Sequence, residues 1–87
     1  MPEHQLTTSE LVKVITEQTD IQYMEVVAIL NYGMRSSHFL CYDDGLIYDE
    51  GCDGDEFQCT PTEFLEEYKN YTWVVDEIFR EDDDYAN

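Results

Sequence analysis

The first apolar repeat of the chain has the spacing of a helix. Thr7 is suited to be an N-cap, and Glu10, three residues later, completes a capping box with it. Residues 8–18 then carry apolar side chains at helical spacing, namely Leu11, Val14 and Ile15. We therefore predict a helix over 8–18.

The next apolar stretch, 22–34, is compatible with two structures. Its aliphatic positions fit one side of a helix that ends near Gly33, namely Val26, Val27, Leu30 and Met34. The β-branched residues in the same stretch suit a strand instead, namely Val26, Val27 and Ile29. Helix is the favoured prediction, and strand is the alternative.

Two short apolar and aromatic runs, 38–42 and 46–50, flank the turn Asp43-Asp44-Gly45. An Asp-Gly step between such runs is typical of a β-hairpin. We therefore predict two short antiparallel strands that pair with each other.

A second helix start follows an acidic loop. Thr60 and Glu63 form another capping-box pattern, and Pro61 occupies the first helical position. We predict a helix over 61–70, preceded by a short extended piece at 57–59.

The last apolar stretch is rich in strand formers and predicts a strand at 72–78, although its apolar residues also fit a helix continued over 71–79. The predicted order is α-α-β-β-α-β. This order indicates an α+β fold with a short antiparallel sheet, formed as one domain over 1–80. Residues 81–87 are expected to be a flexible acidic tail.

The composition excludes several classes of protein. The 87 residues include 21 Asp and Glu against 4 Lys and Arg, a formal net charge of −17, yet 43% are hydrophobic and 14% aromatic. Disordered chains are poor in aromatic and β-branched residues, so we expect a folded domain. The charge argues against nucleic acid and anionic membranes as direct ligands. No apolar run reaches the roughly 20 residues of a membrane-spanning helix, and the N-terminus lacks the basic and apolar regions of a signal peptide. A cytoplasmic protein with a basic partner is the prediction.

The negative charge is concentrated in the second half of the chain. Residues 1–42 hold five acids and two bases, whereas 43–87 hold sixteen acids and two bases. Clustered like charge raises the free energy of a compact state, so such a surface is best explained by a partner that neutralises it. The acids that we predict to contact this partner are Asp43, Asp44, Asp49, Glu50, Asp53, Asp55, Glu56, Glu63, Glu66, Glu67, Asp76 and Glu77.

Metal-binding and catalytic motifs are weak. The three cysteines include no Cys-x-x-Cys pair, so zinc ligation with His38 or His4 is disfavoured. The segment 49–60 aligns poorly with a calcium loop, because Thr60 stands where a bidentate Glu is required. His38 has no evident nucleophile partner in the sequence. We therefore predict no metal, no cofactor and no enzymatic activity.

Residues 10–31 resemble the N-terminal helical hairpin of the bacterial histone-like protein HU. They share its Glu-Leu-Val start at Glu10, a short turn after Thr19 and an aliphatic run at 26–30. The resemblance implies two helices. After residue 36 the chain lacks the basic, Gly- and Arg-rich β-arm that binds DNA in that family, so DNA binding is not implied.

The size, charge and aromatic content of the whole chain resemble those of the acidic DNA-mimic proteins of bacteriophages and mobile elements. Such proteins occupy the DNA site of a host protein, and one of them inhibits HU. The resemblance implies an inhibitor that meets a basic DNA-binding protein in the host bacterial cytoplasm, with HU as the best candidate. The alternative is an acidic adaptor or regulator that acts through an apolar patch, in anti-restriction, anti-CRISPR or RNA polymerase-binding roles. A homodimer would double the acidic surface, and the sequence leaves the oligomeric state open.

Overall fold

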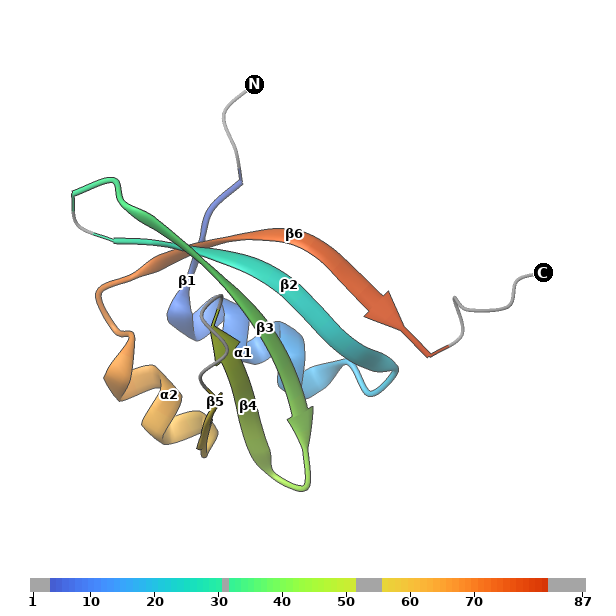
Figure 1. The fold of residues 1–87 in the computed structure, drawn as a ribbon. Coiled ribbons are helices and arrows are strands. Elements are labelled where there is room, and N and C mark those ends of the chain that lie inside the picture. The colour runs from blue at the N-terminus through green and yellow to red at the C-terminus, as the bar shows by residue number, and fades with distance from the viewer. Residues whose placement is uncertain (1–3, 31, 52–55, 82–87) are drawn as a thin grey trace.

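The computed structural model describes residues 4–30, 32–51 and 56–81. Over these residues, six antiparallel strands form one twisted sheet in the order β1-β6-β2-β3-β4-β5, accompanied by two short helices (Figure 1). In chain order the elements are β1 (Leu6–Thr7), α1 (Thr8–Glu17), β2 (Ile21–Ile29), β3 (Arg35–Asp43), β4 (Leu46–Gly51), β5 (Glu56–Cys59), α2 (Pro61–Glu67) and β6 (Thr72–Arg80).

The predicted α+β fold with the order α-α-β-β-α-β is wrong, because the chain is mainly an antiparallel sheet. The principal error is the stretch 22–34, which contains β2 instead of a helix. Its buried residues alternate at the period of a strand, at Met24, Val26 and Ala28. Apolar residues between them, such as Val27, lie half-buried on the opposite face, which hides the alternation. The second helix implied by the resemblance to the HU hairpin is therefore this strand.

The other predicted helices and strands are confirmed, whereas residues 82–87 of the predicted tail lie outside the described residues. Both helices begin with the expected capping box, at Thr7 and at Thr60, although α2 ends at Glu67, before the predicted 70. The β3–β4 hairpin turns through Asp44 and Gly45 at φ values of 61° and 80°. Positive φ at both central residues is the signature of a type I′ turn, which explains the Asp-Gly step. The final stretch is strand β6.

Both helices pack on one face of the sheet, which we call the inner face. Leu11 and Ile15 of α1 and Phe64 of α2 share a core with buried sheet residues, among them Met24, Val26, Leu40, Ile47 and Trp73. Among the described residues, no helix covers the opposite face, which we call the outer face. Neither helix is long and apolar enough to cross a membrane in the described part of the chain.

Candidate functional site

A line of glutamates crosses the outer face. In the register of the sheet, Glu77 of β6 lies opposite Glu25 of β2, and Glu25 lies opposite Phe39 of β3. On the other side of Phe39, Glu50 of β4 lies opposite it, and Glu56 of β5 lies opposite Glu50. We call the four glutamates the carboxylate row. At about 4.8 Å per strand, the row spans roughly 19 Å. Glu50, Glu56 and Glu77 are exposed, Glu25 is half-buried, and Phe39 is 40% exposed.

The row depends on the pleat and on one irregularity of the sheet. Because Met24 and Val26 point into the core, Glu25 between them points outward. In β6, Val75 pairs with Val26 while Glu77 pairs with Glu25, so the register shifts and Asp76 becomes the extra residue of a bulge. This bulge brings Glu77 opposite Glu25.

An apolar groove lies beside the row. Its volume is about 370 Å³. It is lined by aromatic, apolar and acidic residues, which include Tyr23, Phe39, Cys41, Tyr48, Glu50 and Glu56. The Tyr23 ring stacks on Phe79 at a centroid distance of 4.4 Å and meets the edge of Phe39 at 6.1 Å. We call this hollow the outer groove. It combines ring faces with carboxylates, which is the combination that attracts organic cations.

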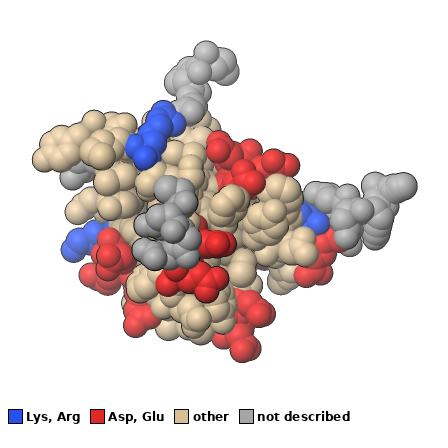
Figure 2. Space-filling model, viewed as in Figure 1, with Lys and Arg blue, Asp and Glu red and all other residues tan. Residues whose placement is uncertain are grey.

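The predicted partner-binding acids do not all lie on this face. Glu50, Glu56 and Glu77 belong to the row. The other exposed acids of the set lie at the β3–β4 turn, on α2 and at the β6 bulge, namely Asp43, Asp44, Glu63, Glu66, Glu67 and Asp76. Figure 2 shows carboxylates in several separate groups with few basic side chains between them. Asp53 and Asp55 lie outside the described residues.

Glu25 was missed by the sequence reasoning, because a helix was expected at its position. The signal that could have found it is the alternation of Met24, Glu25 and Val26 in a strand whose other residues, apart from Gln22, are apolar or aromatic. Once β2 is read as a strand, Glu25 is the only acid on it and must face outward.

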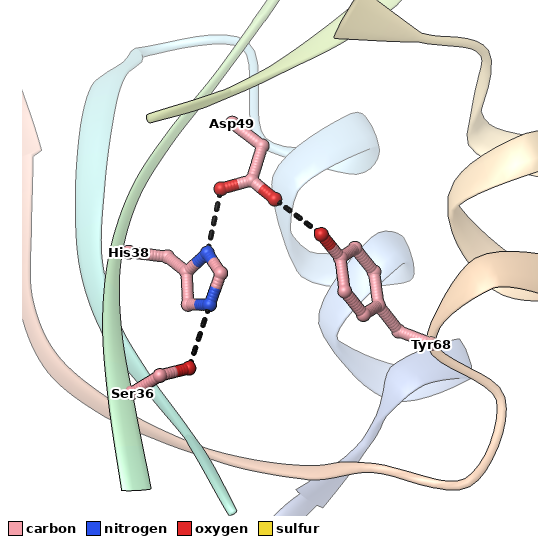
Figure 3. A network of polar contacts seen from close by, with 4 residues as sticks. All are labelled: Ser36, His38, Asp49 and Tyr68. Atoms are coloured by element: carbon pink, nitrogen blue, oxygen red, sulfur yellow. Dashed lines mark hydrogen bonds and ion pairs between the residues drawn. The ribbon is translucent and has the colours of Figure 1, made fainter. Parts of the chain in front are cut away.

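Asp49 is the exception in the predicted set, since it points inward and is 3% exposed. Its Oδ1 lies 2.7 Å from His38 Nδ1, and its Oδ2 accepts a hydrogen bond from the Tyr68 hydroxyl at 2.8 Å (Figure 3). His38 Nε2 lies 2.9 Å from Ser36 Oγ. The Thr8 hydroxyl donates a hydrogen bond to the backbone carbonyl of Tyr68 and accepts one from the Trp73 indole N–H at 2.9 Å. The network thus joins β3, β4, α1, β6 and the end of α2.

The order Ser36–His38–Asp49 is the connectivity of a serine hydrolase triad. Its surroundings, however, are those of a packed core. The His38 side chain is 12% exposed, and the centroid of its ring lies 5.5 Å from that of Trp73 and 6.1 Å from that of Tyr68. Ser36 and His38 line neither the outer groove nor the hollow between Phe57 and α2. We therefore interpret the network as the means by which the buried Asp49 carboxylate is satisfied.

The two thiols in the described part of the chain, those of Cys41 and Cys59, have raised pKa values. Burial, followed by the charges of Glu63, Asp49 and Glu67, raises the pKa of Cys59 from 9.0 to about 11. Burial, with the charges of nearby acids, also raises the pKa of Cys41. Because the thiolate is the reactive form, a raised pKa makes both thiols less reactive at neutral pH than an unperturbed cysteine.

The raised pKa of Cys59 predicts a loss of stability in alkali. Below about pH 9 the Cys59 thiol is protonated in both the folded and the unfolded state, so its contribution to the free energy of unfolding is fully present. Between pH 9 and 11 the unfolded chain releases the proton first, and the free energy of unfolding falls by up to about 1.4 kcal/mol per pH unit. Burial and the hydrogen bond to Asp49 also raise the pKa of Tyr68, which extends the loss to higher pH. Urea unfolding at pH 8 and 10.5 measures this loss. Cys59→Ala should show the smaller decrease, and an equal decrease in both proteins would contradict the assignment to Cys59.

No group of three or more His, Cys, Asp or Glu side chains that could hold a metal ion occurs among the described residues. Comparison of the chain with protein-family models, with curated proteins and with solved structures found no match. The site must therefore be interpreted from its own geometry and charge.

Proposed function

We propose that the chain is a DNA-mimic inhibitor. It presents the carboxylate row to the DNA-binding surface of a basic host protein in the bacterial cytoplasm and blocks the binding of DNA. The histone-like nucleoid protein HU is the best candidate partner, a choice that rests on the resemblance to acidic phage proteins. The observation that carries the proposal is the carboxylate row on a sheet face that no helix covers in the described part of the chain.

The spacing of the row supports the proposal. Glu77 and Glu25 form one pair of neighbouring charges, Glu50 and Glu56 form another, and Phe39 separates the pairs. The centres of the two pairs are three strand spacings apart, or roughly 14 Å. The major groove of B-DNA is about 12 Å wide, so two lines of phosphate charge across a groove have a similar separation.

The energetic cost of the row also supports a partner. Like charges directly opposite each other on neighbouring strands are destabilising, and the row contains two such pairs. None of the four Lys and Arg residues of the chain belongs to the row, so the repulsion between its glutamates is not offset within the row. Lys and Arg side chains of a DNA-binding surface would offset it.

An adaptor that acts through an apolar patch is the second candidate, because large apolar side chains are exposed elsewhere. Tyr32 and Met34, near the β2–β3 turn, are 90% and 62% exposed. These two residues carry no charge, so a partner bound there would be insensitive to salt.

Competition for DNA tests the proposal directly. Fluorescein-labelled duplex is bound to purified HU, and the protein is titrated in at 50 and 200 mM salt while anisotropy is recorded. We expect release of the duplex and weaker inhibition at the higher salt. Retention of the duplex at both salt concentrations would reject HU as the partner. Inhibition that is lost in a Tyr32→Ala, Met34→Ala variant and is unaffected by salt would favour the adaptor.

A further inference from the structure

We infer that the β5 edge of the sheet accepts an extended, arginine- or lysine-bearing segment of the partner as an additional strand. The inference rests on the proposed function for the basic character of the partner. It goes further by naming the shape of the bound element and the place where it binds.

The first observation is the position of β5. This strand, Glu56–Cys59, is last in the sheet order, and among the described residues no strand pairs with its second side. Glu56, Phe57 and Gln58 are all exposed, and Phe57 is 43% exposed. An uncovered edge strand presents main-chain donors and acceptors to an incoming strand.

The second observation is that acidic grooves flank this edge on both faces of the sheet. On the outer face lies the outer groove, with Glu50 and Glu56. On the other side, Phe57 and α2 bound a hollow of about 580 Å³, which we call the α2 groove. It is lined by Phe57, Gln58, Thr62, Glu63, Glu66 and Glu67.

The occupant follows from the pleat of a strand. Neighbouring strands are about 4.8 Å apart, and successive side chains point to opposite faces. A strand added beside β5 would therefore direct alternate side chains toward the outer groove and toward the α2 groove. Both grooves offer carboxylates, so basic side chains on both faces of the segment are complementary. The Tyr48 ring of the outer groove, on the strand next to β5, further favours guanidinium groups.

The probe for this site is the synthetic peptide Thr-Arg-Arg-Thr-Arg-Arg-Thr, which carries arginines on both faces when extended. With the peptide bound, we expect amide hydrogen exchange to slow by at least tenfold within Glu56–Cys59. Exchange in β1, at the opposite edge of the sheet, should not change. A peptide that is N-methylated at two adjacent central residues has a donor blocked on each edge, and it should bind at least tenfold more weakly. Equal binding by the methylated peptide, or binding without protection of β5, would overturn the inference.

Paired charge variants locate the peptide. Glu50→Gln with Glu56→Gln removes two charges from the outer groove, and Glu66→Gln with Glu67→Gln removes two from the α2 groove. Each double variant should bind the peptide about tenfold more weakly. Glu17→Gln with Glu81→Gln removes two charges away from β5 and should change the affinity by less than twofold. If all three double variants lose affinity equally, the peptide responds only to net charge and the inference fails.

The inference and the proposed function can fail separately. Release of DNA from HU without protection of β5 in that complex would leave the function standing and reject strand addition. Protection of β5 by the peptide, combined with failure to release DNA, would reject HU inhibition and leave the strand-addition site in place.

Discussion

Replacing Asp49 by Ala is expected to lower the free energy of unfolding by about 3 kcal/mol or more. The substitution removes the acceptor of both His38 and the Tyr68 hydroxyl, and it leaves these polar groups in the core without their partner. Urea unfolding, with the slope held common to all variants, measures the loss. Such a loss is a large part of the stability of a domain of this size.

Three further variants make this test specific. Asp43→Ala removes an exposed acid of the same hairpin and should change the stability by no more than about 0.5 kcal/mol. Tyr68→Phe removes one of the two hydrogen bonds to Asp49 and should cost about 1 kcal/mol. The loss in Asp49→Ala combined with Tyr68→Phe should be smaller than the sum of the single losses, because the two side chains interact. If Asp49→Ala costs no more than Asp43→Ala, the network does not stabilise the fold.

Local signals in the sequence predicted the helix starts and the hairpin correctly. A capping box specifies its own hydrogen bonds within four residues, as at Thr60 and Glu63, and no distant partner is needed. The Asp44-Gly45 turn is equally local, because its positive φ values require residues of this type. These elements could be predicted because their cause lies within a few neighbouring residues.

The sheet could not be predicted in the same way. β2 is a central strand with apolar residues on both faces, so its period is hidden and its pattern matches that of a helix. The carboxylate row requires the register of five strands and a bulge at Asp76, and none of these is visible in one segment. The inward position of Asp49 follows from the register of β4 beside β3, and its partners His38 and Tyr68 are distant from it in the sequence.

Neutralising the carboxylate row is expected to weaken binding to HU, the proposed partner, by roughly 100-fold while making the protein more stable. The variant combines Glu25→Gln, Glu50→Gln, Glu56→Gln and Glu77→Gln. Each carboxylate that is paired with a cation in the complex contributes up to about 1 kcal/mol, so the loss of four is large. The free protein loses two pairs of directly opposed like charges, each costing about 0.2–1 kcal/mol. Its Tm should therefore rise by about 5 °C.

A matched variant removes the same number of charges from outside the carboxylate row, through Glu10→Gln, Glu17→Gln, Asp44→Asn and Glu81→Gln. Asp44 was in the predicted contact set, but it lies at the β3–β4 turn and not in the row. All four positions are exposed. Gln at position 10 retains the capping-box pattern, and Asn at position 44 tolerates a positive φ. Both variants should slow association similarly, because electrostatic steering responds to the overall field. The row variant alone should dissociate much faster, since contacts at the interface determine the dissociation rate.

The opposite signs of these effects distinguish a binding surface from a merely acidic one. An acidic surface that serves only solubility would gain stability on neutralisation and lose little affinity, and both charge variants would then behave alike. Carboxylates that stabilise the fold would instead lower the Tm when removed. Only a surface that is retained for a basic partner, at a cost to the free protein, predicts a higher Tm together with faster dissociation of the row variant. Surface plasmon resonance and thermal unfolding of the two variants measure both quantities.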